Sequence, residues 1–137
     1  DTIVLSGGEN IEPVPIEEAL RESEYIESAV VIGQDRKALS CLIVIDVKNT
    51  ERYLKESGIL YINRDHLETI EEVKSLINSE IAKRVSKEKG FKAFEQVSRF
   101  TLLPESFKVG RELSGKQEVK RKTVAEMYSK EIEAMYR

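Results

Sequence analysis

Residues 25–47 decide the fold, and they read YIESAVVIGQDRKALSCLIVIDV. Two runs rich in β-branched residues, Tyr25–Gly33 and Leu39–Val47, are separated by the polar segment Gln34-Asp35-Arg36-Lys37. Apolar runs of this length on either side of a short polar segment are typical of two paired strands. We therefore predict a β-hairpin over these residues.

Helices and one further strand are predicted around the hairpin. In residues 70–89 apolar side chains recur every three or four positions, which places them on one stripe of a helix. Thr69 and Glu72 have the spacing of a capping box for this helix, and Gly90 follows its end. Residues 97–103 predict a strand that Pro104 ends.

Three other helices are predicted from weaker signals. One covers about residues 16–23, and one runs to Ser57 from a cap at Asn49 or Thr50. The last covers residues 124–136, with Thr123-x-x-Glu126 as its capping box. Strands and helices that do not strictly alternate predict an α+β fold: a small sheet of about three or more strands with a hairpin, flanked by helices. The 137 residues fit a single domain.

Composition excludes several classes of protein. With 40% hydrophobic and 34% charged residues, the chain is too apolar to be disordered and too charged to be embedded in a membrane. One cysteine and one histidine exclude the common zinc frameworks, so we predict no metal site. A net charge of −3 argues against a general nucleic-acid binder.

Basic residues gather near the end of the chain. Residues 1–35 hold nine acidic residues and one basic residue, whereas residues 107–137 hold eight basic and five acidic residues. The basic cluster includes Lys116, Lys120, Arg121 and Lys122. Two interpretations fit it equally: the solvated start of a helix, or a binding site for an anion.

Two glycine-bearing segments are candidates for a functional role. Gly7-Gly8 forms either a plain tight turn or a surface that a ligand approaches closely. Residues 107–116 end in Lys116, a long cation suited to stabilising a carboxylate or phosphate. This segment lacks the spacing of a phosphate-binding loop.

Other reactive residue types have structural explanations. We expect Cys41 to pack in the core and His66 to lie in a loop or at the start of a helix. The acidic pairs Glu17-Glu18 and Glu71-Glu72 are expected in first helical turns, where carboxylates favour the helix dipole.

A family resemblance connects the two glycine-bearing segments. Residues 1–13, DTIVLSGGENIEP, and the following Ile16-Glu17 closely resemble the hinge-proximal motif of the adenylate-forming superfamily. They are most similar to long-chain fatty-acid CoA ligases, where the pattern Lys-Asp-x-Ile-x-x-x-x-Gly-Glu-Asn-Ile-x-Pro opens a small C-terminal domain. Val31–Lys37 resembles the hairpin of that domain. The resemblance covers nearly the whole chain and implies the C-terminal lid domain of a larger two-domain enzyme, with its hinge residue before Asp1.

The resemblance implies a two-step ligase reaction. Fatty acid and ATP, with Mg²⁺ in the full-length enzyme, give an acyl-adenylate and pyrophosphate; CoA then gives acyl-CoA and AMP. The large N-terminal domain of the same chain binds ATP and the fatty acid, while the C-terminal domain swivels to serve each step. We expect this domain alone to be inactive and to bind none of these molecules by itself.

The same resemblance nominates three residues and leaves an alternative for one of them. Gly7 and Gly8 match a loop that borders the tunnel for the pantetheine arm of CoA. Ser114-Gly115-Lys116 resembles the Ser-Gly-Lys form of the catalytic lysine, which makes Lys116 the cation at the fatty-acid carboxylate and the ATP α-phosphate. Long-chain ligases usually show the pattern Thr-x-Thr-x-Lys-x-[Lys/Arg]-Arg. If Lys120-Arg121 is aligned without a gap to the end of this pattern, Glu118 takes the position of the catalytic lysine.

Two other functions stay open at this point. One is an acyl-adenylate enzyme that loads a carrier protein instead of CoA. The other is a non-catalytic interaction module whose basic residues Lys120 to Lys122 bind an acidic partner or an anionic membrane surface. We expect a cytoplasmic parent protein, with peripheral contact at the inner membrane face as an option, and no nucleic-acid partner.

Overall fold

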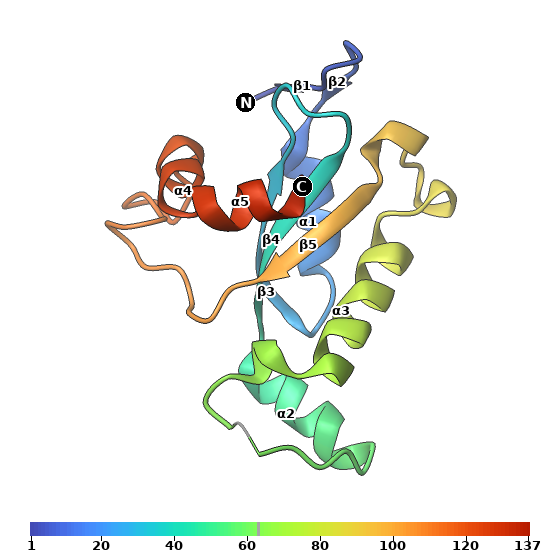
Figure 1. Cartoon of the computed structure of the whole chain (residues 1–137), viewed down its shortest axis with the longest axis vertical. Helices are drawn as coiled ribbons and strands as arrows, with labels where there is room; N and C mark the ends of the chain where they lie inside the picture. The colour runs from blue at the N-terminus through green and yellow to red at the C-terminus, as the bar shows by residue number, and fades with distance from the viewer. Residues whose placement is uncertain (63) are drawn as a thin grey trace.

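The structure, a computed structural model, describes residues 1–62 and 64–137. Within these residues the strands are β1 Ile3–Val4, β2 Asn10–Ile11, β3 Ile26–Ile32, β4 Leu39–Ile45 and β5 Val97–Leu102 (Figure 1). The α-helices are α1 Pro13–Arg21, α2 Val47–Glu56, α3 Glu71–Arg84, α4 Arg121–Met127 and α5 Ser129–Met135. Single turns of 3-10 helix lie at Leu67–Thr69, Lys87–Lys89 and Ala93–Glu95. The predicted α+β class is confirmed.

The main sheet has three strands in the order β3-β4-β5. Strands β3 and β4 are antiparallel, with Val30 opposite Leu42, so the predicted hairpin is confirmed. Strand β5 runs parallel to β4, with Phe100 opposite Cys41, because residues 46–96 cross over between the two strands. Strands β1 and β2 pair in a separate two-stranded sheet.

Helices cover both faces of the main sheet, and the central strand β4 is therefore buried along its whole length (Figure 1). Alternate side chains of a strand point to opposite faces. One set packs with apolar residues of α1 and α3: Ala29, Val31, Cys41, Ile43 and Ile45. The other packs with apolar residues of α4 and α5: Val30, Leu42 and Val44.

The first two helices begin earlier than predicted. Helix α1 begins at Pro13, where proline is tolerated because the first helical N–H groups have no partner within the helix. Helix α2 begins at Val47, and its N-cap is Asp46, whose side chain accepts a hydrogen bond from the Asn49 N–H at 2.9 Å. The predicted cap at Asn49 or Thr50 is therefore wrong.

Helix α3 keeps the predicted stripe but not the predicted ends. Val73, Ile77, Ile81 and Val85 are buried. The capping box does not form, because Ile70 is the N-cap and Thr69 belongs to the preceding 3-10 turn. The α-helix ends at Arg84, and Gly90, with φ +91°, closes a separate turn at Lys87–Lys89.

The last predicted helix is two helices. Helix α4 begins at Arg121, so the proposed capping box of Thr123 and Glu126 does not form. The chain leaves helical geometry at Tyr128, with φ −108° and ψ 26°, and α5 begins at Ser129. No helix among the described residues has the length and apolarity needed to cross a membrane.

Candidate functional site

The glycine loop, Ser6–Glu9, joins β1 to β2 and is closed by backbone hydrogen bonds. Gly8 donates its N–H to the carbonyl of Leu5 at 2.9 Å, and Leu5 donates to the carbonyl of Glu9 at 3.0 Å. Gly8 has a φ of +93°, which favours glycine, and a Cβ built there meets no atom within 4 Å. The predicted turn is confirmed, and its tip is open to an approaching group. The role of Gly7 and Gly8 beside CoA stays a prediction.

The glycine loop is attached to the β3–β4 turn. Ser6 donates its N–H to the carbonyl of Arg36 at 2.8 Å, and Asp35 donates to the carbonyl of Val4 at 2.9 Å. The side-chain oxygen of Gln34 accepts from the Val4 N–H at 3.1 Å. These bonds tie the short β1–β2 sheet to the main sheet.

The second candidate segment, which we call the lysine loop, is Leu113–Lys120. Ser114 donates its N–H to the carbonyl of Glu118 at 2.8 Å, and its hydroxyl accepts from the N–H groups of Lys116 and Glu118 at 3.3 and 3.2 Å. Lys116 therefore lies in a hydrogen-bonded turn, and its side chain is exposed. Its predicted role stays untested.

A buried carboxylate closes the base of the lysine loop. Glu112 is fully buried, and its carboxylate accepts hydrogen bonds from the Lys108 N–H at 3.1 Å, from Arg111 Nε at 2.6 Å and from the Tyr128 hydroxyl. Its carbonyl accepts from the Lys120 N–H at 2.8 Å. One residue thus connects both ends of the loop with the junction of α4 and α5.

The hydrogen bonds around Glu112 set its ionisation. Burial by itself raises the pKa of this carboxyl, but the bonds from Arg111, Tyr128 and the Lys108 N–H outweigh burial and lower the pKa to about 2. Burial and the neighbouring carboxylate raise the pKa of Tyr128 to about 12. Glu112 is therefore an anion and Tyr128 a neutral donor across the physiological pH range.

A second buried carboxylate holds the start of α4. Glu17 in α1 is 3% exposed and binds the Arg121 guanidinium through both of its oxygens, which we call the Glu17–Arg121 bridge. Glu17 Oε2 also accepts from the Val31 N–H at 2.8 Å. Arg121 Nε lies 3.4 Å from an oxygen of Asp1. Because α1 begins at Pro13, Glu17 lies beyond its first turn, and the predicted dipole role of Glu17 is wrong.

A cavity of about 610 Å³ lies beside these groups. Its charged lining includes Glu17, Arg21, Glu27, Glu118 and Arg121. Glu118 thus faces a charged hollow, whereas Lys116 is not among the lining residues. The two residues that the resemblance makes alternatives for one role therefore lie in different surroundings.

The basic cluster is less available to an anion than its sequence indicates. Arg121 is committed to Glu17 and Asp1, so its charge is already compensated. Lys116, Lys120 and Lys122 are exposed. These lysines can still be either the solvated start of a helix or part of an anion-binding site, whereas Arg121 is neither.

The structure does not bring the glycine loop and the lysine loop together. Figure 1 places the turn between β1 and β2 apart from the chain that leads into α4, although Asp1, before β1, contacts Arg121. Gly7 and Gly8 are not among the residues that line the cavity beside Glu118. The two loops are therefore separate surfaces of one domain.

Cys41, His66, Glu71 and Glu72 lie where the sequence predicted them. Cys41 is fully buried, and burial raises the pKa of its thiol. His66 precedes the turn at Leu67–Thr69, and Glu71 and Glu72 lie in the first turn of α3. Among residues 1–62 and 64–137, no group of three or more His, Cys, Asp or Glu is arranged to hold a metal ion.

The AMP-binding enzyme C-terminal domain is the family whose model matches residues 1–137. The chain belongs to this family. The domain is 35% identical, over 99% of its length, to AEE15 of Arabidopsis thaliana, a chloroplastic long-chain-fatty-acid acyl-carrier-protein ligase. It is 29% identical, over 99% of its length, to FadD15 of Mycobacterium tuberculosis, a long-chain-fatty-acid CoA ligase. The domain spans 17% and 22% of these two relatives.

Solved structures share the fold of the domain. The adenylation domain of a carboxylate reductase from Mycobacterium chelonae superposes with a TM-score of 0.79 at 22% identity, over 98% of this chain and 19% of that one. An acyl-CoA synthetase from Brucella canis gives 0.55 at 14% identity, over 96% of this chain and 20% of that one. At these identities the likeness concerns the fold alone.

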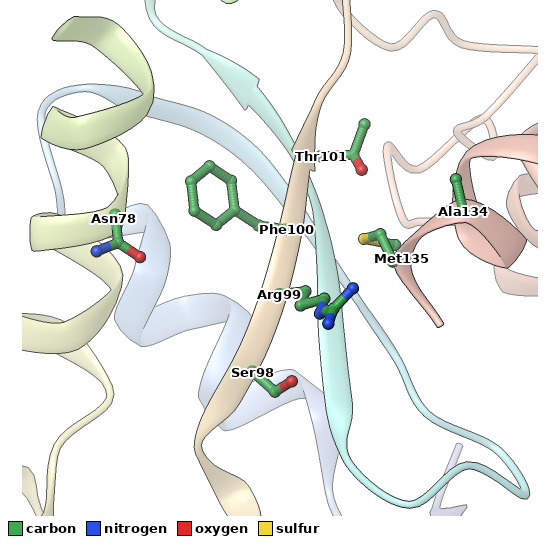
Figure 2. A pocket seen from close by; sticks show the side chains of 7 residues that line it. All are labelled: Asn78, Ser98, Arg99, Phe100, Thr101, Ala134 and Met135. Atoms are coloured by element: carbon green, nitrogen blue, oxygen red, sulfur yellow. The ribbon is translucent and has the colours of Figure 1, made fainter. Parts of the chain in front are cut away.

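A further hollow of about 400 Å³ lies along the edge strand β5 of the C-terminal domain. Figure 2 shows Phe100 on the side of α3 and Met135 on the side of α5, with Arg99 between the strand and α5. Gly7, Gly8, Lys116 and Glu118 are not among its lining residues. This hollow is therefore separate from the candidate residues.

Sequence reasoning missed two of the residues that organise the lysine loop. Glu112 carried no signal, because its burial depends on Tyr128, which follows it by 16 residues in the chain. For Glu17 a signal existed: it follows Pro13 by four positions and precedes Leu20 by three, and both of these residues are buried in α1. Residues at this spacing share one helix face, so Glu17 was placed to be buried with them.

Proposed function

We propose that the chain is the mobile C-terminal domain of a cytoplasmic long-chain fatty-acid CoA ligase. The observation that carries this proposal is the match of the family over all 137 residues, together with relatives named as long-chain fatty-acid ligases. A larger N-terminal domain of the same polypeptide, ATP, Mg²⁺, fatty acid and CoA are the partners in this proposal. The glycine loop, which is open at Gly8, and the exposed Lys116 supply surfaces that such partners can reach.

The chemistry proceeds in two steps. A fatty-acid carboxylate oxygen attacks the α-phosphorus of ATP and displaces pyrophosphate, which leaves an acyl-adenylate. The thiol of CoA, losing its proton, then attacks the acyl carbon and displaces AMP. In the first step a cation at the meeting point of carboxylate and phosphate stabilises negative charge in the transition state. Lys116 is the candidate for this cation. In the second step Gly7 and Gly8 leave room for the thiol-bearing arm.

Removal of Lys116 in the full-length ligase tests this assignment. For Lys116→Ala we expect fatty-acid-dependent pyrophosphate exchange to fall by about a hundredfold or more, in line with the loss of other electrostatic stabilisers. Thioester formation from preformed acyl-adenylate should continue. Lys130→Ala, an exposed lysine of α5, is the matched control and should leave both steps unchanged.

The other alignment makes the opposite prediction. If Glu118 occupies the catalytic position, Lys116→Ala leaves pyrophosphate exchange unchanged and Glu118→Lys increases it. Loss of exchange in Lys116→Ala, with no gain in Glu118→Lys, supports Lys116. Absence of exchange in the wild-type ligase and in Glu118→Lys would remove the proposed function itself.

A second candidate has a specific observation in its favour. AEE15, at 35% identity, is named as an acyl-carrier-protein ligase. In this second candidate function the domain serves a carrier protein's phosphopantetheine thiol in place of CoA. Competition between CoA and acyl-carrier protein for one pool of acyl-adenylate separates the two.

Fractionation of cells, followed by detection of the parent protein, tests the cytoplasmic location and any contact with the membrane.

A further inference from the structure

The Glu17–Arg121 bridge is more buried and makes more hydrogen bonds than an ordinary ion pair on the surface. Glu17 is 3% exposed, and both of its carboxylate oxygens bind Arg121. A buried charge is costly unless hydrogen bonds replace the lost water, and the Val31 N–H at 2.8 Å supplies a further donor. The bridge therefore joins three segments: α1, β3 and the start of α4.

The bridge lies directly beyond the lysine loop. Arg121 follows Lys120, whose N–H donates to the Glu112 carbonyl at 2.8 Å and whose carbonyl accepts from the Val124 N–H at 2.9 Å. The hydrogen bonds of Glu112 hold the first end of the loop and also the Lys120 N–H at its second end. The Glu17–Arg121 bridge adds a side-chain support directly after Lys120, so Glu17 supports the second end of the loop together with Glu112.

The same guanidinium also reaches the start of the chain. Arg121 Nε lies 3.4 Å from Asp1 Oδ2, and Asp1 leads through β1 into the glycine loop. One arginine therefore contacts the segment before the glycine loop and the segment after the lysine loop. This places the two separate loops on a common support.

We propose that Glu17 and Arg121 are positioning residues that fix the lysine loop relative to β1, so that the glycine loop and the lysine loop move as one body. Neither residue touches a substrate in this proposal. Its consequence for catalysis rests on the proposed function, whereas the positioning itself is a property of the chain. Loss of the bridge should loosen the lysine loop and leave the sheet intact.

Amide hydrogen exchange in the parent protein tests the positioning without any substrate. Glu17→Gln keeps an acceptor for the Val31 N–H, and Arg121→Lys keeps the charge but loses the two-pronged contact. In both variants we expect exchange in residues 113–124 to rise by about tenfold or more, because the loss of a charged hydrogen bond raises the population of locally open states. Exchange in residues 42–45 of β4 should not change.

The matched control is Glu24→Gln. Glu24 pairs with Arg52 at the surface, where both side chains are at least half exposed, so its loss should alter neither segment. Unchanged exchange in residues 113–124 of Glu17→Gln and Arg121→Lys would overturn the proposal. An equal rise in residues 42–45 would also overturn it, because the bridge would then stabilise the whole domain and not the loop.

Kinetics of the two half-reactions provide a second readout. A misplaced lysine loop should lower kcat for adenylation in Glu17→Gln by about tenfold while the KM for fatty acid stays constant, because the loop acts in the transition state. A rise in KM with kcat unchanged would contradict positioning. If the wild-type parent performs no adenylation, the proposed function fails, and hydrogen exchange still decides whether the bridge positions the loop.

Discussion

Replacing Glu112 by glutamine keeps the shape of a buried side chain and removes the charge at the base of the lysine loop. The carboxylate accepts hydrogen bonds from Lys108, Arg111 and Tyr128, which lower its pKa from 4.5 to about 2. One pKa unit corresponds to about 1.4 kcal/mol, so the charge contributes roughly 3 kcal/mol at neutral pH. We expect Glu112→Gln to lower the free energy of unfolding by about 2–3 kcal/mol at pH 7.

The pH dependence identifies the charge as the cause. The pKa of Glu112 is lower in the folded than in the unfolded state, so its contribution is fully present above pH 4.5 and is lost as the pH falls toward 2. Urea unfolding at pH 7, 5, 4 and 3 measures the difference between wild type and Glu112→Gln. By pH 3 this difference should shrink to roughly half or less.

Glu118→Gln is the control for this experiment, because Glu118 is an exposed carboxylate in the same loop. It should change the free energy of unfolding by less than about 0.5 kcal/mol. A difference between wild type and Glu112→Gln that is the same at pH 3 and pH 7 would refute the reasoning, because a pH-independent loss comes from packing and not from the carboxylate charge.

Two further predictions concern the core. Gly33→Ala should destabilise the domain by about 1–3 kcal/mol in urea unfolding, because a Cβ there lies 2.6 Å from a methyl carbon of the buried Leu39. The control Gly115→Ala should be nearly neutral, because a Cβ at Gly115 meets open space. Equal effects of the two substitutions would contradict this prediction. Cys41 is fully buried in β4, and burial raises the pKa of its thiol. A thiol reagent at pH 8 should therefore modify Cys41 only after denaturant is added. Rapid labelling of the native protein would contradict this and show that β4 opens.

Local patterns in the sequence predicted the sheet well. The hairpin of β3 and β4 and the strand β5 lie within two residues of their predicted bounds. A strand that is buried in the core shows this in its own sequence, as an alternating or continuous run of apolar residues. The pairing of β5 with β4 in parallel was not predicted. A strand pattern indicates that a segment is extended, but it does not indicate which strand lies beside it.

Helix ends and the supports of the candidate site could not be predicted, because distant residues determine them. The junction of α4 and α5 lies at Tyr128, whose hydroxyl binds Glu112, and the start of α4 is held by Glu17, which lies 104 residues away in the chain. The exposed tips of the glycine loop and the lysine loop were found from sequence, because their motifs are local. Of the buried carboxylates that hold them, Glu112 forms part of no local motif, and the spacing that places Glu17 on the buried face of α1 does not indicate its partner Arg121.

The crossover between β4 and β5 also has a consequence for how the chain acquires its fold. The two strands of the hairpin are neighbours in sequence and can pair after closing a short loop. Strand β5 pairs with β4 only when residues 46–96 form a long closed loop between them. The entropy lost on closing such a long connection slows refolding but depends only weakly on its length. The arrival of β5 should therefore be the late event in refolding, and a change in the length of the crossover should cost little as long as α3 keeps its contacts with the sheet.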